Sequence, residues 1–259
     1  MTNMLSDEDV IQFITKGYVC LHDAFDSKLA AECSELLWKA SGYNAKDPTS
    51  WLQPVVRLGE MFQPPFQQAA NSPRLLAAFD QLLGEGKWIP RNSLGSFPLR
   101  FPHKDQPGDD GWHVDASFPG DDPQNYFNWR MNIYSKGRGL LMLFLFSEVG
   151  SDDAPTRIRE GSHLQVARLL APAGENGLSF MEVAQQVTVT NWMPEVMATG
   201  QPGTVYLCHP FIVHAAQAHR GRNPKFMAQP PLLIKEPLQL QRDDKNYNPV
   251  EKAIRLAIN

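Results

Sequence analysis

The 259-residue chain contains only three cysteines, Cys20, Cys33 and Cys208, which are odd in number and far apart in the sequence. This pattern does not supply the disulfide framework of a small secreted protein, and it favours reduced thiols. The first residues also lack the basic region and apolar core of a secretory signal. We therefore expect a cytoplasmic protein.

An excess of positive charge and a long apolar run are absent as well. The chain has 24 Lys and Arg against 28 Asp and Glu, which gives a formal net charge of −4. Because a nucleic-acid-binding surface normally needs a basic face, we expect no nucleic acid as a partner. The longest apolar run, residues 140–146, has the length of a strand and is too short to cross a membrane. A small molecule is the remaining kind of partner that we expect.

Sequence signatures of several enzyme classes are missing too. No G-x-S-x-G, P-loop or G-x-G-x-x-G follows a predicted strand, which argues against hydrolases, nucleotidases and dinucleotide-dependent dehydrogenases. The chain also has no C-x-x-C pair, so its cysteines do not indicate a structural zinc site. No internal repeat and no linker rich in Gly, Ser or Pro divides the chain, and its length suits a single domain over residues 1–259.

The first third of the chain is predicted to be mainly helical. Ser6 and Asp9 form a capping-box-like start for a helix that ends at Gly17. A short strand is predicted at 18–21, and further amphipathic helices are predicted at about 27–40 and 73–83. We expect this helical cap to occupy residues 1–88.

After Gly86 the pattern changes to short apolar runs separated by Pro, Gly, Asp and Asn clusters, which is typical of an all-β sandwich or barrel. Strands are predicted at 99–101, 111–118, 128–134, 140–149, 203–208, 213–217 and 226–234. The run 140–146 is apolar on both faces, as in a central strand covered on both sides. Helices are predicted to begin at Ser162 and Ser179. The predicted fold is mainly β (α+β), with a β-barrel core at 89–235 and a C-terminal tail at 236–259.

The segment 112–115 carries the first candidate for chemistry. On a strand, residues two apart point to the same face, so His113 and Asp115 are expected to project together. An imidazole and a carboxylate side by side can occupy two neighbouring positions on a metal. A second histidine would complete the 2-His-1-carboxylate arrangement that binds Fe(II) and leaves positions open.

Two histidines downstream can supply the third ligand. His209 precedes Pro210, where a strand should break, whereas His214 begins the next predicted strand. We favour His214 as the metal ligand and expect His209 to be a structural or pocket-edge group. His163 is also expected to be structural. Aromatic residues that could line a pocket are Trp112, Phe118, Trp129, Tyr134 and Trp192.

Four blocks of the sequence, in the same order, resemble the phytanoyl-CoA dioxygenase-like family of Fe(II)- and 2-oxoglutarate-dependent oxygenases. They are SDEDVIQFITKGYVCLHDAFDSKLAAECSELL, WHVD, DDAPTRIREGSHL and GTVYLCHPFIVHAAQAHRGRNPKF. The resemblance implies a double-stranded β-helix (jelly-roll, cupin-like) core with flanking and inserted helices. It also implies His113, Asp115 and His214 as the catalytic metal ligands.

The chain departs from this family at the residue that anchors 2-oxoglutarate. The family usually has an arginine eleven residues after the distal histidine, and here that position is Lys225. A lysine can pair with a carboxylate but loses the bidentate fork of arginine. Arg222 and Arg220 lie nearby and are alternative anchors, and a surface position for Lys225 is the other interpretation.

Arg100 is a second candidate for the co-substrate site. It lies among apolar neighbours in FPLRF, so a buried guanidinium there needs an anionic partner. That partner is either 2-oxoglutarate, as the family resemblance implies, or a carboxylate in a structural salt bridge.

The resemblance implies an oxidoreductase with Fe(II), 2-oxoglutarate and O2 as cofactor and co-substrates. Such a dioxygenase would hydroxylate an unactivated C–H bond of a small organic molecule and release succinate and CO2. Asp115 disfavours halogenation, because iron halogenases of the family lack this carboxylate. The alternatives are a cupin-like metal oxygenase or isomerase that does not use 2-oxoglutarate, and a non-catalytic binding module on the same fold.

Overall fold

The computed structural model describes residues 4–259 and contains two main antiparallel sheets. In the larger sheet the strand order is β1-β9-β5-β11, and β12 also pairs with β5. The smaller sheet has the order β10-β6-β8, and two further pairs are β2-β3 and β4-β7. The strands are β1 (Tyr18–Leu21), β2 (Val55–Leu58), β3 (Phe97–Arg100), β4 (Arg130–Met131), β5 (Leu140–Leu145), β6 (Thr156–Arg159), β7 (Leu178–Ser179), β8 (Glu195–Ala198), β9 (Val205–Cys208), β10 (His214–Ala215), β11 (Met227–Ala228) and β12 (Pro231–Leu232).

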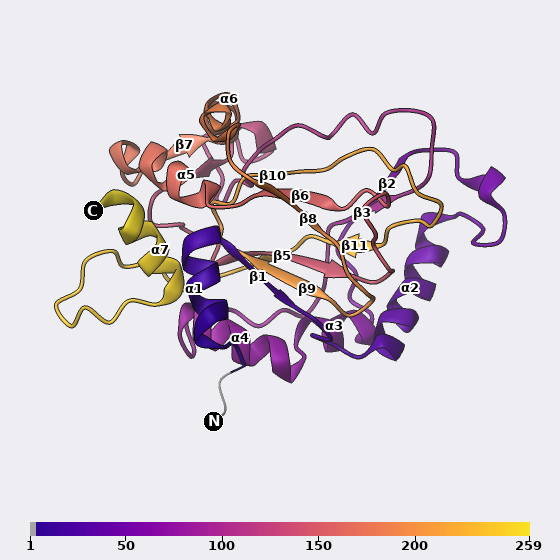
Figure 1. Cartoon of the computed structure of the whole chain (residues 1–259), viewed down its shortest axis with the longest axis horizontal. Coiled ribbons are helices and arrows are strands. Elements are labelled where there is room, and N and C mark those ends of the chain that lie inside the picture. The colour runs from indigo at the N-terminus through magenta and orange to yellow at the C-terminus, as the bar shows by residue number, and fades with distance from the viewer. Residues whose placement is uncertain (1–3) are drawn as a thin grey trace.

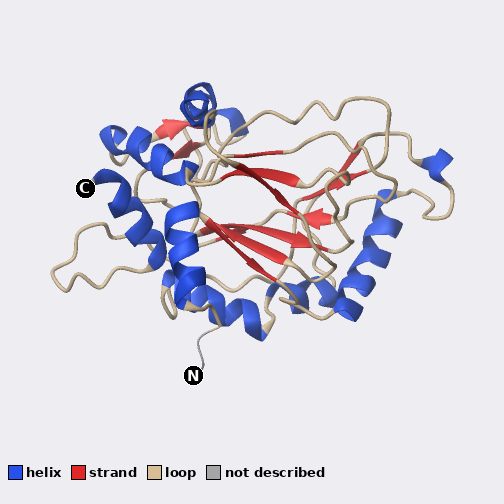
Figure 2. Cartoon of the chain, in the orientation of Figure 1, coloured by secondary structure: helices blue, strands red, loops and turns tan. Residues whose placement is uncertain are grey.

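Helices surround these sheets, and the strands occupy the middle of the molecule (Figure 2). The α-helices are α1 (Asp7–Lys16), α2 (Ser27–Ser41), α3 (Pro64–Ala70), α4 (Pro73–Leu83), α5 (Ser162–Leu170), α6 (Phe180–Gln186) and α7 (Pro249–Ile258). The 3-10 helices are η1 (Pro48–Ser50), η2 (Tyr126–Asn128), η3 (Ala171–Ala173) and η4 (Val187–Thr190). None of the helices in the described residues is long and apolar enough to cross a membrane.

Capping contacts confirm the predicted helix starts at Ser6 and Ser179. The Ser6 hydroxyl accepts the Asp9 N–H, and the Asp9 carboxylate accepts the Ser6 N–H. Ser179 and Glu182 form the same reciprocal pair at the start of α6. Gly17 ends α1 with a φ of 87°, a left-handed conformation that glycine adopts without steric cost.

The central strand β5 separates two hydrophobic clusters. Its even-numbered residues, such as Met142 and Phe144, belong to the large cluster that includes side chains of α1, α2, α3 and α4. Its odd-numbered residues, such as Leu141 and Leu143, pack in a smaller cluster with Ile158 of the second sheet. The prediction that the 140–146 run is covered on both faces is therefore confirmed, and the smaller cluster fills the space between the two sheets.

Several predicted strands are shorter than expected, and one is largely irregular. Residues 111–118 form only isolated bridges at His113 and Phe118, since the flanking Gly, Asp and Pro residues do not favour continuous pairing. The predicted strand at 226–234 is divided into β11 and β12 around Pro230, which has no N–H to donate to a neighbour.

The two ends of the described chain are integrated into the fold. β1, within the predicted helical cap, pairs with β9 at the edge of the larger sheet. The region predicted as a tail contains α7, which packs against α1, α4 and α5 (Figure 1). The cysteines Cys20, Cys33 and Cys208 form no disulfide.

Candidate metal centre and cofactor pocket

His113 and His214 lie opposite each other on two paired chain segments. Each residue donates its backbone N–H to the carbonyl of the other, at 3.0 Å in both directions. Residues paired in this way point their side chains to the same face, and the two ring centroids are 4.4 Å apart. The pairing therefore brings together two imidazoles that are about a hundred residues apart in the sequence.

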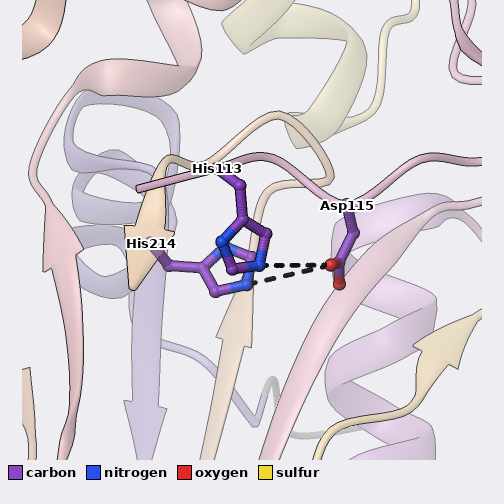
Figure 3. A group of neighbouring side chains, drawn as sticks. All are labelled: His113, Asp115 and His214. Carbon is purple, nitrogen blue, oxygen red and sulfur yellow. Dashed lines mark ion pairs between the residues drawn. The ribbon is translucent and has the colours of Figure 1, made fainter. Parts of the chain in front are cut away.

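Asp115 completes a compact group with the two histidines (Figure 3). Its Oδ1 lies 3.7 Å from His113 Nε2 and 3.9 Å from His214 Nε2. One ligand atom from each of the three side chains lies within 4.8 Å of the others. The expected proximity of His113 and Asp115 is present, although the segment that carries them is irregular and not a regular strand.

Backbone carbonyls orient both imidazoles toward Asp115. His113 Nδ1 lies 2.8 Å from the Gly111 carbonyl, and His214 Nδ1 lies 3.2 Å from the Ile212 carbonyl. A carbonyl only accepts, so each Nδ1 carries the proton and each Nε2 keeps a lone pair. Fixing the tautomer through the second nitrogen is the usual arrangement for metal-binding histidines.

Arg138 holds the third member of the group in place. Its Nη1 donates to Asp115 Oδ2 at 2.8 Å, and its Nη2 donates to the Ala116 carbonyl at 3.1 Å. The contact occupies Oδ2 and leaves Oδ1 facing the two imidazoles. Arg138 was not singled out from the sequence, because its 23-residue separation from Asp115 carries no local pattern.

The protonation states in this group suit a cation ligand. Burial alone would raise the pKa of Asp115, but the charges of Arg138, His214 and His113 hold that pKa well below its usual range. Burial, followed by repulsion from His113, lowers the pKa of His214 to about 4. At neutral pH the group therefore offers a carboxylate and a neutral buried imidazole.

The amide of Gln229 also reaches this group. Its Nε2 donates to His214 Nε2 at 3.0 Å, and its backbone N–H donates to the Ser96 carbonyl at 2.9 Å. A cation on His214 Nε2 would replace this amide contact. No sequence pattern points to Gln229, because it lies directly after the two-residue strand β11.

A cavity of about 970 Å³ adjoins the group and is lined by His113, Asp115 and His214. Its charged lining residues outside the group are Arg57, Glu60, Arg100, Asp109, Arg138 and Lys225. Its aromatic lining residues are Trp112, Tyr126, Phe127, Trp129 and Phe180. A volume of this size accommodates a small organic ligand with its co-substrate.

Lys225 is buried in this cavity lining and is not on the surface. It is 1% exposed, and its Nζ donates to the Ala154 carbonyl at 2.6 Å. Within residues 4–259 no carboxylate forms an ion pair with it. Burial and then repulsion from Arg100 lower the pKa of Lys225 well below its usual value. An anion in the cavity would supply the missing counter-charge.

Arg100 forms a structural salt bridge with a carboxylate of the protein, which is one of the two alternatives left open by the sequence. Its two Nη atoms donate to Asp109 Oδ1 and Oδ2 at 3.0 and 2.8 Å, and Arg57 also contacts this carboxylate. The backbone of Arg100 pairs with that of Lys225 in both directions. Arg100 therefore lies beside Lys225 but already has a carboxylate partner.

The structure does not bring the other candidates to the metal group. His209 is buried in the core, where its Nε2–H donates to the Val250 carbonyl and its Nδ1 accepts the Phe211 N–H. His163 is buried and donates to the Ile14 carbonyl. Arg222 and Arg220 are exposed and do not line the cavity.

The aromatic candidates divide into three groups. Trp112 and Trp129 line the cavity, whereas Phe118 and Tyr134 line a separate groove. Trp192 is 73% exposed. Tyr126, Phe127 and Phe180, which also line the cavity, were not predicted; they follow Pro, Asp and Ser positions that indicate only turns and a helix start.

No protein-family model matches the sequence, and no curated protein matches it. The fold does resemble solved structures. The carbocyclase SnoK from nogalamycin biosynthesis, described as non-heme and alpha-ketoglutarate dependent, superposes with a TM-score of 0.61 at 17% identity over 89% of this chain and 84% of that chain. HygX from Streptomyces hygroscopicus, solved with nickel, 2-oxoglutarate and hygromycin B, superposes with a TM-score of 0.58. The sequence identity is 14%, and the match covers 94% of this chain and 96% of that chain.

EctD from S. alaskensis, solved with 2-oxoglutarate and 5-hydroxyectoine, gives a TM-score of 0.54 at 21% identity over 90% of this chain and 76% of that chain. Similarity at this level of identity establishes a shared fold. The chain therefore shares the fold of these three proteins, while its own chemistry has to be argued from its own residues.

Proposed function

We propose that this protein is an Fe(II)- and 2-oxoglutarate-dependent oxygenase that hydroxylates a C–H bond of a small organic molecule. The observation that carries the proposal is the group His113, Asp115 and His214 at a cavity that also contains the buried amino group of Lys225. Two imidazoles and one carboxylate are the ligand set of non-haem Fe(II) oxygenases. The residues present fit both the metal and the anionic co-substrate.

In this proposal, His113 Nε2, His214 Nε2 and Asp115 Oδ1 would hold the iron. The metal with its co-substrates supplies the oxidising chemistry, and the protein supplies binding, orientation and exclusion of water. Arg138 keeps Asp115 ionised and directs a single oxygen toward the histidines. Three protein ligands would leave further positions on the metal available to the co-substrates.

Lys225 is proposed as the partner of the distal carboxylate of 2-oxoglutarate. Its Nζ has one hydrogen bond, to the Ala154 carbonyl, and two N–H groups remain for a carboxylate. Arg100 supports this role indirectly, because its backbone fixes Lys225 and its guanidinium adds positive potential.

Two other features support the same proposal. Among the resembling structures, SnoK is described as alpha-ketoglutarate dependent, and HygX and EctD were solved with 2-oxoglutarate bound. The arrangement of two facing antiparallel sheets is consistent with a double-stranded β-helix core, which we include in the proposal. The four sequence blocks described above support membership of the phytanoyl-CoA dioxygenase-like group.

The test is an anaerobic titration of Fe(II) and 2-oxoglutarate, followed by exposure to oxygen. We expect a weak visible charge-transfer band when both are bound, and succinate release after oxygen is admitted. Asp115→Ala and His214→Ala should abolish the band, since a missing ligand cannot be replaced by its neighbours. His209→Ala should keep iron, with circular dichroism confirming that the variant is folded.

The outcomes separate the alternative functions. Iron binding without a band on 2-oxoglutarate addition would favour a cupin-like enzyme that does not use this co-substrate. Failure to bind Fe(II) would favour a binding module. If His209→Ala loses iron while His214→Ala retains it, the assignment of the third ligand is wrong.

A further inference from the structure

The cavity contains an aromatic cluster that the proposed metal and 2-oxoglutarate sites do not use. Tyr126 and Phe127 come from η2 and Phe180 begins α6; the ring of Phe180 lies 5.4 Å from Tyr126 and 5.9 Å from Phe127. Trp129 extends the cluster, 5.6 Å from Tyr126. All four side chains line the cavity.

Two members of this aromatic cluster are too exposed to act as core residues. Phe127 is 58% exposed and Tyr126 is 41% exposed. Exposed rings that gather in one cavity are typical of a ligand-binding surface, because a bound apolar group would remove their faces from water. The cluster also adjoins the metal group, since the Phe180 ring is 5.8 Å from His113.

The charges of the same cavity leave a positive excess at Arg57. Asp109 already receives two hydrogen bonds from Arg100, yet Arg57 contacts the same carboxylate. One carboxylate therefore serves two guanidinium groups, and the Arg57 side chain is 61% exposed. Glu60, the remaining carboxylate of the lining outside the metal group, is paired with Arg91. This distribution complements an anion and not a cation.

We propose that the substrate carries an apolar ring system and an anionic group. The ring system packs on the aromatic cluster beside His113, and the anionic group pairs with Arg57 of β2, which lies apart from α6 (Figure 1). This inference rests on the proposed function, because it assigns Lys225 to 2-oxoglutarate and leaves Arg57 for the substrate. The contact with the rings would place C–H bonds of the substrate near the metal ligands.

The test uses the full chain loaded with Ni(II) and saturating 2-oxoglutarate, titrated calorimetrically with three probes. They are 2-naphthoate, which has rings and an anion, 2-naphthylmethylammonium, which has rings and a cation, and gluconate, which has an anion without rings. We expect 2-naphthoate to bind more tightly than the other two. Equal or tighter binding of the ammonium compound, or of gluconate, would overturn the substrate class.

Matched variants test the two contacts separately. Phe127→Ala should weaken 2-naphthoate binding about three- to tenfold, as expected for loss of one aromatic contact. Phe62→Ala is the control, because Phe62 has the same 58% exposure but does not line the cavity. Arg57→Gln should weaken 2-naphthoate about two- to fivefold and leave the ammonium probe unaffected. Arg74→Gln, an exposed arginine on α4, should change neither.

The design separates failure of this inference from failure of the proposed function. If 2-oxoglutarate does not bind the Ni(II)-loaded protein, the proposed function fails first. If 2-oxoglutarate binds but 2-naphthoate does not, or Phe127→Ala binds as the wild type does, only the substrate class is wrong. Tighter 2-naphthoate binding when 2-oxoglutarate is withdrawn would place the probe at Lys225 and would also overturn the inference.

Discussion

Lys225 illustrates how much a single residue in this cavity depends on its surroundings. A lysine in the loop preceding β11 is ordinarily exposed, yet here the amino group is buried beside Arg100 with only a carbonyl partner. Keeping a buried amino group protonated without a counter-ion costs several kcal/mol, so an anion bound beside Lys225 would favour its charged form. The absence of a carboxylate partner for Lys225 among the described residues therefore supports an anionic group of the co-substrate at this position.

Replacement of Lys225 by alanine should therefore weaken 2-oxoglutarate binding about 10- to 100-fold. A hydrogen bond to a charged group contributes about 1.5–3 kcal/mol, which corresponds to this range. The measurement is an anaerobic titration of 2-oxoglutarate against the iron band. The affinity for Fe(II) alone should stay nearly unchanged, because Lys225 does not belong to the metal group.

Two arginine variants provide the comparison. Arg222→Ala removes an exposed charge outside the cavity and should bind 2-oxoglutarate as the wild type does. Arg100→Ala should have a smaller effect than Lys225→Ala, because Arg100 already pairs with Asp109. Wild-type binding by Lys225→Ala together with a loss in either arginine variant would assign the anchor to that arginine.

At the scale of elements, helices α6 and α7 begin with the same motif in different surroundings. Glu182 of α6 and Glu251 of α7 each accept the N–H of the residue that caps their helix. Glu182 is exposed, whereas Glu251 is 1% exposed, also accepts the Gln239 N–H and pairs with Arg242. The second glutamate therefore ties α7 to the preceding chain in addition to capping it.

Glu251→Ala should lower the free energy of unfolding by about 2–4 kcal/mol, because it removes the cap and also takes the acceptor away from the Gln239 N–H and the partly buried Arg242 guanidinium. Glu182→Ala removes the same cap in an exposed helix and should cost about 0.5–1 kcal/mol. Urea unfolding followed by circular dichroism measures both values. Equal losses would show that the buried contacts of Glu251 add nothing to the cap.

At the scale of the whole molecule, the metal group joins segments that are distant in the sequence. His113 and Asp115 lie on an irregular segment with few backbone hydrogen bonds, and His214 lies on a two-residue strand. A ligand that binds only the folded protein stabilises it by mass action. Metal binding should therefore stabilise a region in which regular pairing is sparse.

Saturating Ni(II) with 2-oxoglutarate should raise the melting temperature by about 8–16 °C. At a concentration about 1,000 times the Kd the stabilisation is about 4 kcal/mol, and each kcal/mol corresponds to about 2–4 °C for a chain of this size class. Differential scanning calorimetry measures the shift, and addition of a chelator should reverse it. Asp115→Ala is the control, and an undiminished shift in that variant would contradict the proposed ligand set.

Features that depend on residues close together in the chain could be predicted from the sequence. The capping pair of Ser6 and Asp9, the end of α1 at Gly17 and the two apolar faces of β5 follow from local spacing, and the structure confirms them. The close approach of His113 and Asp115 follows from their separation by two residues. Each of these features involves residues only a few positions apart, and over that distance the backbone geometry restricts where their side chains can lie.

Contacts between groups far apart in the chain could not be predicted and depend on the three-dimensional fold. It paired His113 with His214, gave Arg100 its partner Asp109, and brought Arg138 to Asp115. It also buried Lys225, whose place in the sequence is equally compatible with an exposed loop. These contacts depend on how the two sheets pack and on the course of the irregular segments between them. Because such packing involves residues far apart in the chain, no local pattern encodes it.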